Sequence, residues 1–101
     1  MENKPKLIIT AIPNKENMQA MQSYLEQAGP FAPKYGGVFV SRYKTLKHLA
    51  GKNGAELMSI IEFPISQSIE DMLNDEDYKK LIDIREKGFT KLNMRICEEM
   101  Y

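Results

Sequence analysis

The chain has few of the residues that build covalent or metal-centred sites. Among its 101 residues there is one cysteine, Cys97, and one histidine, His48. A single cysteine excludes an internal disulfide framework and is typical of a reducing compartment. A histidine without a second, suitably spaced ligand makes neither a zinc site nor a haem site. We therefore expect a cytoplasmic protein that needs no metal and no cofactor.

Long apolar runs are also missing. No run approaches the roughly 20 residues of a membrane span, and no long apolar core follows residues 1–6 as it would in a signal peptide. We expect neither a membrane span nor a signal peptide. Hydrophobic residues make up 43% of the chain and charged residues 28%, which is ordinary for a globular protein. The length predicts one domain, residues 1–101.

The net charge is zero but unevenly distributed. Residues 27–55 hold five basic residues and no acid, whereas residues 56–86 hold nine acids against three bases. Solvated surfaces explain most runs of this kind. The alternative is that oppositely charged ends attract each other across a symmetric dimer.

Hydrophobic periodicity predicts four strands and two helical regions. The strands are expected at 7–12, about 37–46, 56–63 and 92–97. One helical region follows the first strand, capped by Asn14, and is broken by Pro30 and Pro33 before Tyr35. The other begins at Ser66 or Ser68, breaks at 74–75 with a new N-cap, and continues over 76–89.

This order, β-α-β-β-α-β, predicts an α+β fold of the ferredoxin-like type, with a four-stranded antiparallel sheet and helices on one face. The first and third strands are apolar on both faces. The helices can cover only one face, so a second copy of the sheet is the economical cover for the other. The RNA-recognition motif has the same order, but its stacking aromatics on the two central strands are missing here, and so is a basic footprint. We expect no nucleic-acid partner.

Several short motifs, taken in order, are similar to a small uncharacterised family of the dimeric α+β-barrel superfamily. They are Tyr35-Gly36-Gly37, Arg42 on the next strand, Glu62-Phe63-Pro64, Glu76-Asp77-Tyr78 and Arg85. The resemblance covers residues 7–96 and implies a homodimer in which two sheets form a barrel. The family it resembles has no agreed reaction. More distant relatives include cofactor-independent monooxygenases, haem-dependent chlorite-degrading enzymes, haem-degrading oxygenases and lactone isomerases, so fold alone says little about chemistry.

Arg85 is the most informative candidate for a site because it interrupts an apolar stripe on its helix. A charge there needs a partner or a route to solvent, and Glu62, near the end of the third strand, is the expected partner. Arg42 on the second strand is the third member of the set. These residues form either a structural ion pair, with arginine stems packed against the core, or a group that faces a ligand.

The tyrosines complete the candidate site. Tyr43 and Tyr78, together with Tyr24 and Tyr35, supply phenolic groups to a cavity or pack in the core with their hydroxyls satisfied. Asp75 and its acidic neighbours are expected to cap a helix rather than bind metal. Two functions stay open. One is a barrel that binds a small polar or anionic molecule through Arg42, Glu62, Arg85, Tyr43 and Tyr78, with or without catalysis; the other is a non-catalytic homodimeric module.

Overall fold

The structure is a computed structural model that describes residues 3–52 and 54–100. Its elements follow the expected order, with each helical region divided into shorter helices. They are β1 (Lys6–Pro13), α1 (Met18–Ala28), α2 (Phe31–Lys34), β2 (Val38–Lys44), β3 (Leu57–Glu62), α3 (Ser66–Leu73), α4 (Glu76–Lys79), α5 (Ile82–Gly88) and β4 (Phe89–Cys97).

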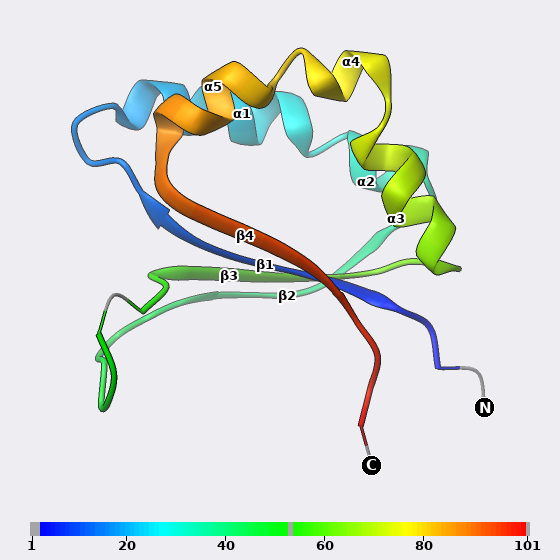
Figure 1. Cartoon of the computed structure of the whole chain (residues 1–101), viewed down its shortest axis with the longest axis horizontal. Helices are drawn as coiled ribbons and strands as arrows, with labels where there is room; N and C mark the ends of the chain where they lie inside the picture. Colours follow the sequence, from blue (N-terminus) through cyan, green and yellow to red (C-terminus); the bar gives the residue numbers. More distant parts are fainter. Residues whose placement is uncertain (1–2, 53, 101) are drawn as a thin grey trace.

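The four strands form one sheet in the order β2-β3-β1-β4, and every neighbouring pair is antiparallel. All the helices lie on the same side of this sheet (Figure 1). The predicted α+β, ferredoxin-like class is therefore confirmed. No helix in the described ranges is long and apolar enough to cross a membrane.

The core lies between the sheet and the helices. Leu7 on β1 and Phe63 just after β3 are completely enclosed there, together with Ile69 of α3. A second cluster, at the other end of this layer, joins Tyr24 of α1 to Tyr78 of α4. Alternate residues of the central strands thus supply the apolar floor on which the helices pack.

Within residues 3–52 and 54–100 no helix lies on the opposite side of the sheet, which we call the open face. Strand pairing fixes which side chains lie on it, because directly opposed residues share a face. The open face holds Ile8, Thr10 and Ile12 of β1, Met58, Ile60 and Glu62 of β3, Val38, Ser41 and Tyr43 of β2, and Lys91, Asn93 and Arg95 of β4. Several apolar members are well exposed, including Val38 at 64% and Tyr43 at 57%.

Strand β2 contains a bulge that the sequence pattern does not reveal. Phe39 pairs with Ile61 and Ser41 pairs with Ile60, which leaves Val40 as an extra residue. As a result, Arg42 comes opposite Ser59 and lies on the helix side of the sheet together with Phe39. The guanidinium of Arg42 stacks over the ring of Phe39, with 4.3 Å between the guanidinium carbon and the ring centroid.

Two of the predicted helix caps are wrong. Asn17, not Asn14, caps α1 by accepting a hydrogen bond from the amide of Ala20 at 3.2 Å. Asn14 instead forms a local turn, its side chain accepting from the amide of Glu16 at 3.1 Å. At α3 the chain enters through extended Ile65, and no serine hydroxyl caps the helix.

The other helix boundaries follow the prediction more closely. Asp75 caps α4, as expected, accepting from the amide of Asp77 at 2.8 Å. Pro30, the residue before the short α2, separates it from α1, whereas Pro33 lies within α2. The expected helix over 76–89 is divided at Lys80–Leu81, and β4 already begins at Phe89 rather than at Leu92. The turn into β2 uses Gly36 at a φ of 83°, a conformation that glycine adopts without strain.

Candidate functional site

Three side chains from three helices form a hydrogen-bonded chain beside the core. Arg85 of α5 donates from Nη1 to the hydroxyl of Tyr78 at 3.0 Å. The hydroxyl of Tyr78 in turn lies 2.8 Å from that of Tyr24. Tyr78 is 3% exposed and Tyr24 5%, whereas the Arg85 side chain is 22% exposed. The chain therefore runs from solvent into the interior.

Aromatic packing fixes the two phenol rings. Tyr24 meets Tyr78 edge to face with ring centroids 6.5 Å apart, and Phe89 at the start of β4 packs against Tyr24 at 5.8 Å. Phe31 of α2 packs against Tyr78 at 5.7 Å. Such T-shaped contacts are favoured by the ring quadrupoles. The rings are thus held by α1, α2, α4 and β4 together.

The hydrogens on the two hydroxyls can be counted. Tyr78 already accepts from Arg85, so either it donates to Tyr24 or it accepts a second hydrogen bond from Tyr24. If Tyr78 donates, the hydroxyl hydrogen of Tyr24 has no partner within the pair. If Tyr24 donates, the hydroxyl hydrogen of Tyr78 has none. No other hydrogen bond of these hydroxyls occurs among residues 3–52 and 54–100. One phenolic hydrogen of the pair is therefore free in either arrangement.

Electrostatics keep Tyr24 protonated and Arg85 charged. Burial, reinforced by the neighbouring Tyr78, raises the pKa of Tyr24 far above its usual value. Burial, the largest single influence, lowers the pKa of Arg85, but the hydrogen bond with Tyr78 and the charge interactions with Tyr78, Tyr24 and Glu86 together outweigh it, so the net direction is upward. At neutral pH the site therefore offers a phenol hydrogen beside a guanidinium.

A cavity of about 80 Å³ is lined by Tyr24 and Tyr78 on the helix side of the sheet. Its walls are mostly apolar, with Tyr24, Tyr78 and Ser59 as the polar members. The remaining lining residues are Leu7, Ile9, Ala28, Gly29, Ala32, Phe39, Ile61, Met72 and Met94. An apolar interior with a few polar groups is the usual composition of a small-molecule site. We call this space the helix-side cavity.

The predicted ion pair between Arg85 and Glu62 is wrong. Glu62 lies on the open face and pairs with Lys6 at 3.6 Å, whereas Arg85 contacts Tyr78 and pairs with Glu86 at 3.7 Å. The sheet separates the two predicted partners. Arg42 shares the helix side with Arg85 because of the bulge in β2. The structure thus joins Arg85 to Tyr78 on the helix side of the sheet, where Arg42 also lies. Glu62 and Tyr43 lie on the open face.

Asp75 connects α2 to the start of α4. Its carboxylate accepts hydrogen bonds from Lys34 at 2.8 Å and from the hydroxyl of Tyr35, besides the capping bond from Asp77. The Lys34 and Tyr35 bonds, followed by the Asp77 amide, hold the pKa of Asp75 well below its usual value. These contacts account for the acidic segment as a helix cap and a tether. Within the described part of the chain, no cluster of three or more histidine, cysteine or acidic side chains is arranged to hold a metal.

Three polar side chains of β4 escaped the sequence reasoning. Lys91, Asn93 and Arg95 all lie on the open face, where they border a second cavity. The signal that could have found them is their spacing of two, which puts alternate residues of a strand on one face. That alternation predicted a strand at 92–97, but the prediction left Lys91 outside the strand and assigned no role to its polar residues.

The topology is an antiparallel sheet with one layer of helices on a single face. It defines the ferredoxin-like α+β class that is found in dimeric α+β barrels. Residues 5–100 match the family described as "Domain of unknown function (DUF1330)", and the chain belongs to that family. No curated protein matches it significantly.

Solved structures with this fold are distant in sequence. A protein of unknown function from Rhodopseudomonas palustris is 15% identical with a TM-score of 0.83, covering 100% of this chain and 85% of its own. An ethyl tert-butyl ether (EthD) family protein from Bacillus halodurans is 18% identical at a TM-score of 0.67, covering 96% and 99%. A provisionally assigned antibiotic biosynthesis monooxygenase from Nitrosomonas europaea is 8% identical at 0.66, covering 100% and 95%. These likenesses establish the fold, not an activity.

Proposed function

We propose that the protein binds a small organic molecule in the helix-side cavity, through a carbonyl, carboxylate or phenolate oxygen. The observation that carries this proposal is the free phenolic hydrogen of the Tyr24–Tyr78 pair. A buried donor is nearly always paired in native proteins, and both tyrosines of this pair line an apolar cavity. The positive charge of Arg85 at the far side of Tyr78 favours an acceptor that carries negative charge.

The size of the cavity limits the ligand. An apolar cavity of about 150 Å³ in another protein holds benzene, whereas the helix-side cavity measures about 80 Å³. The enclosed part of the ligand therefore has only a few heavy atoms, and a larger molecule must extend through the mouth. Arg42, stacked on Phe39 at 4.3 Å, lies on the same side of the sheet and can meet such an extension.

Binding, rather than acid–base chemistry, is the function that the cavity supports best. No carboxylate or imidazole from the described residues lines it, and Tyr24 stays protonated. If the ligand is transformed, as in a cofactor-independent enzyme, the phenol and guanidinium would act by stabilising a developing oxyanion or enolate. The ligand roles predicted for Glu62 and Tyr43 stay predictions that concern the open face.

The experiment is a thermal-shift and NMR screen with small acids, phenols and lactones. A stabilising compound should shift wild type and Tyr43→Phe equally, because Tyr43 lies on the open face and is 57% exposed. It should lose most of its shift in Tyr78→Phe, which removes the acceptor for Arg85 and the partner of Tyr24. Arg85→Lys should weaken anionic ligands more than neutral ones. If no compound class shifts the melting temperature, or Tyr78→Phe responds like wild type, the protein is better described as a non-catalytic module.

We further propose that the chain forms a homodimer through the open face. The support is its exposed apolar surface, which includes Val38 at 64%, Tyr43 at 57% and Met58 at 37%. In addition, no helix of the described part of the chain covers that side (Figure 1). Contiguous apolar surface of this kind is typical of protein interfaces. A cytoplasmic location also stays a prediction, supported by the single cysteine.

Sedimentation equilibrium tests the dimer at micromolar protein. Wild type should give twice the chain mass of 11.6 kDa, and Met58→Glu, which puts a charge at the open face, should give the monomer. Leu25→Glu is the matched control, because Leu25 is 49% exposed on α1, away from the open face. A wild-type protein that sediments only as a monomer would contradict the proposal.

A further inference from the structure

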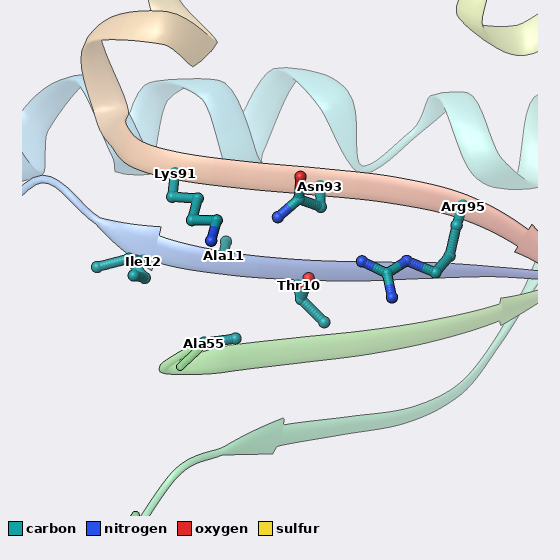
Figure 2. A pocket seen from close by; sticks show the side chains of 7 residues that line it. All are labelled: Thr10, Ala11, Ile12, Ala55, Lys91, Asn93 and Arg95. Atoms are coloured by element: carbon teal, nitrogen blue, oxygen red, sulfur yellow. The ribbon is translucent and has the colours of Figure 1, made fainter. Parts of the chain in front are cut away.

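The open face has a cavity of its own, at the end of the sheet where β1 finishes and β4 begins. Its volume is about 190 Å³, more than twice that of the helix-side cavity. We call it the open-face cavity. It is lined by Thr10, Ala11, Ile12, Ala55, Lys91, Asn93 and Arg95. Figure 2 shows the side chains of Lys91, Asn93 and Arg95 leaving β4 in the direction of β1.

The strand register explains why these groups meet. On β4, Lys91, Asn93 and Arg95 are alternate residues, so all three leave the same face of the sheet. They lie opposite Ile12, Thr10 and Ile8, respectively. The Thr10 hydroxyl is therefore across from the Asn93 amide, with a cation to either side of that pair.

The cavity carries two positive charges without an internal counter-charge. Among the described residues, no acidic side chain lines it and no ion pair involves Lys91 or Arg95. The nearest acids in the sheet register are already engaged, Glu62 by Lys6 and Glu56 by Lys15. The polar groups are an ammonium, a guanidinium, an amide and a hydroxyl. All four can donate hydrogen bonds.

We propose that the open-face cavity binds a small dicarboxylate. Two carboxylates neutralise the two cations, and Arg95 can hold one of them through two parallel hydrogen bonds. Lys91 and Arg95 start from positions four residues apart on β4, with Asn93 between them, and Figure 2 shows both side chains turned toward the middle of this segment. A ligand with one carboxylate at each end can meet both cations at once. Ile12 and Ala55 supply apolar contact for the short carbon chain between the carboxylates.

The test is isothermal titration of the full chain with succinate and, as a matched ligand, butyrate, which has the same number of carbons and one carboxylate. Succinate should bind at least about tenfold more tightly, and Lys91→Gln or Arg95→Gln should each weaken it about tenfold, the loss expected for one charge-assisted hydrogen bond. Lys87→Gln is the control, since it removes an equal charge from an exposed position of α5, on the other side of the sheet. Inorganic phosphate should bind more weakly than succinate.

Other results would overturn the proposal. Equal affinity for succinate and butyrate, or no effect of Lys91→Gln and Arg95→Gln on succinate, would exclude recognition by the two cations. Conversion of the dimer to monomer by Arg95→Gln, with no succinate binding in wild type, would assign these charges to acidic groups of a second copy. The open-face cavity and the helix-side cavity lie on opposite sides of the sheet. Tyr78→Phe, which alters the helix-side cavity, should therefore leave succinate affinity unchanged.

Discussion

Arg85 and Tyr78 are joined by a hydrogen bond of 3.0 Å from the guanidinium to the phenol oxygen, although an apolar helical stripe suggested a carboxylate partner for the arginine. Tyr78 is seven residues before Arg85, and the break between α4 and α5 brings the two together. The hydroxyl is a neutral acceptor, so the positive charge is only partly compensated inside the protein. The exposed part of the side chain, 22%, and the contact with Glu86 supply the rest.

The first prediction concerns which residues are coupled to Arg85. Arg85→Met and Tyr78→Phe share one hydrogen bond, so their effects on the free energy of unfolding should differ from additivity by about 0.5–2 kcal/mol. Arg85→Met and Glu62→Gln lie on opposite sides of the sheet and should add within about 0.5 kcal/mol. Urea denaturation of the single and double variants measures both. A large coupling between Arg85 and Glu62 would contradict the observed pairing.

The second prediction compares the two buried phenols. Tyr78→Phe leaves the Tyr24 hydroxyl buried without a partner, and should cost about 1–3 kcal/mol of unfolding free energy. Tyr24→Phe should cost less, about 0.5–1.5 kcal/mol, because Tyr78 keeps its hydrogen bond from Arg85. Chemical denaturation gives the order. The reverse order would show that Arg85 does not satisfy Tyr78 in solution.

The third prediction is a pH dependence from Asp75. Its pKa is lowered in the folded protein, chiefly by Lys34 and then by Tyr35, so the folded state binds this proton less readily than the unfolded state does. The resulting stabilisation is complete above the unfolded-state pKa of about 3.9 and is lost as the pH falls below it. Melting temperatures between pH 7 and pH 2 should show this loss.

Asp75→Asn should be less stable than wild type at pH 7 and should lose less on acidification. Glu70→Gln, on an exposed position of α3, is the control and should retain the wild-type pH profile. If Asp75→Asn follows the wild-type profile down to pH 2, another carboxylate is responsible for acid unfolding.

The fourth prediction separates backbone strain from crowding at two glycines. Gly36 and Gly51 have φ values of 83° and 86°, where an L side chain costs about 1–2 kcal/mol. A Cβ at Gly36 would also lie 2.9 Å from Cγ of Pro64, whereas a Cβ at Gly51 would have no neighbour within 4 Å. Gly36→Ala should therefore lower the urea midpoint clearly more than Gly51→Ala. Equal effects would mean that Pro64 moves aside at no cost.

The sequence predicted the fold well because its strongest signals were local. Apolar runs at 7–12 and 56–63, the glycines at 36–37 and the cap at Asp75 each correspond to one element boundary or strand. The family membership that the motifs suggested is confirmed by the match over residues 5–100. The errors at Asn14 and Ser66 are of one or a few residues. Asn14 bonds the amide of Glu16 in a local turn while Asn17 caps α1, and α3 begins without a side-chain cap.

The site was harder to predict because it depends on register and on helix breaks. Alternation correctly put Glu62 with Met58 and Ile60, but it could not show that this face is turned away from Arg85. The hydrogen bond between Tyr24 and Tyr78 joins residues 54 apart in the chain, and no periodic pattern links them. The open-face cavity requires β1 and β4 to be aligned so that Thr10 meets Asn93, which composition does not determine.

The extra residue in β2 has a consequence for how this family can vary in length. A single insertion or deletion inside a paired strand normally exchanges the two faces of every residue beyond it. At Val40 the strand already holds one unpaired residue, so its deletion would restore a regular ladder while Phe39 and Arg42 kept their present sides. Relatives that are one residue shorter in β2 should therefore have their gap at position 40. Their equivalent of Arg42 should still lie on the helix side of the sheet.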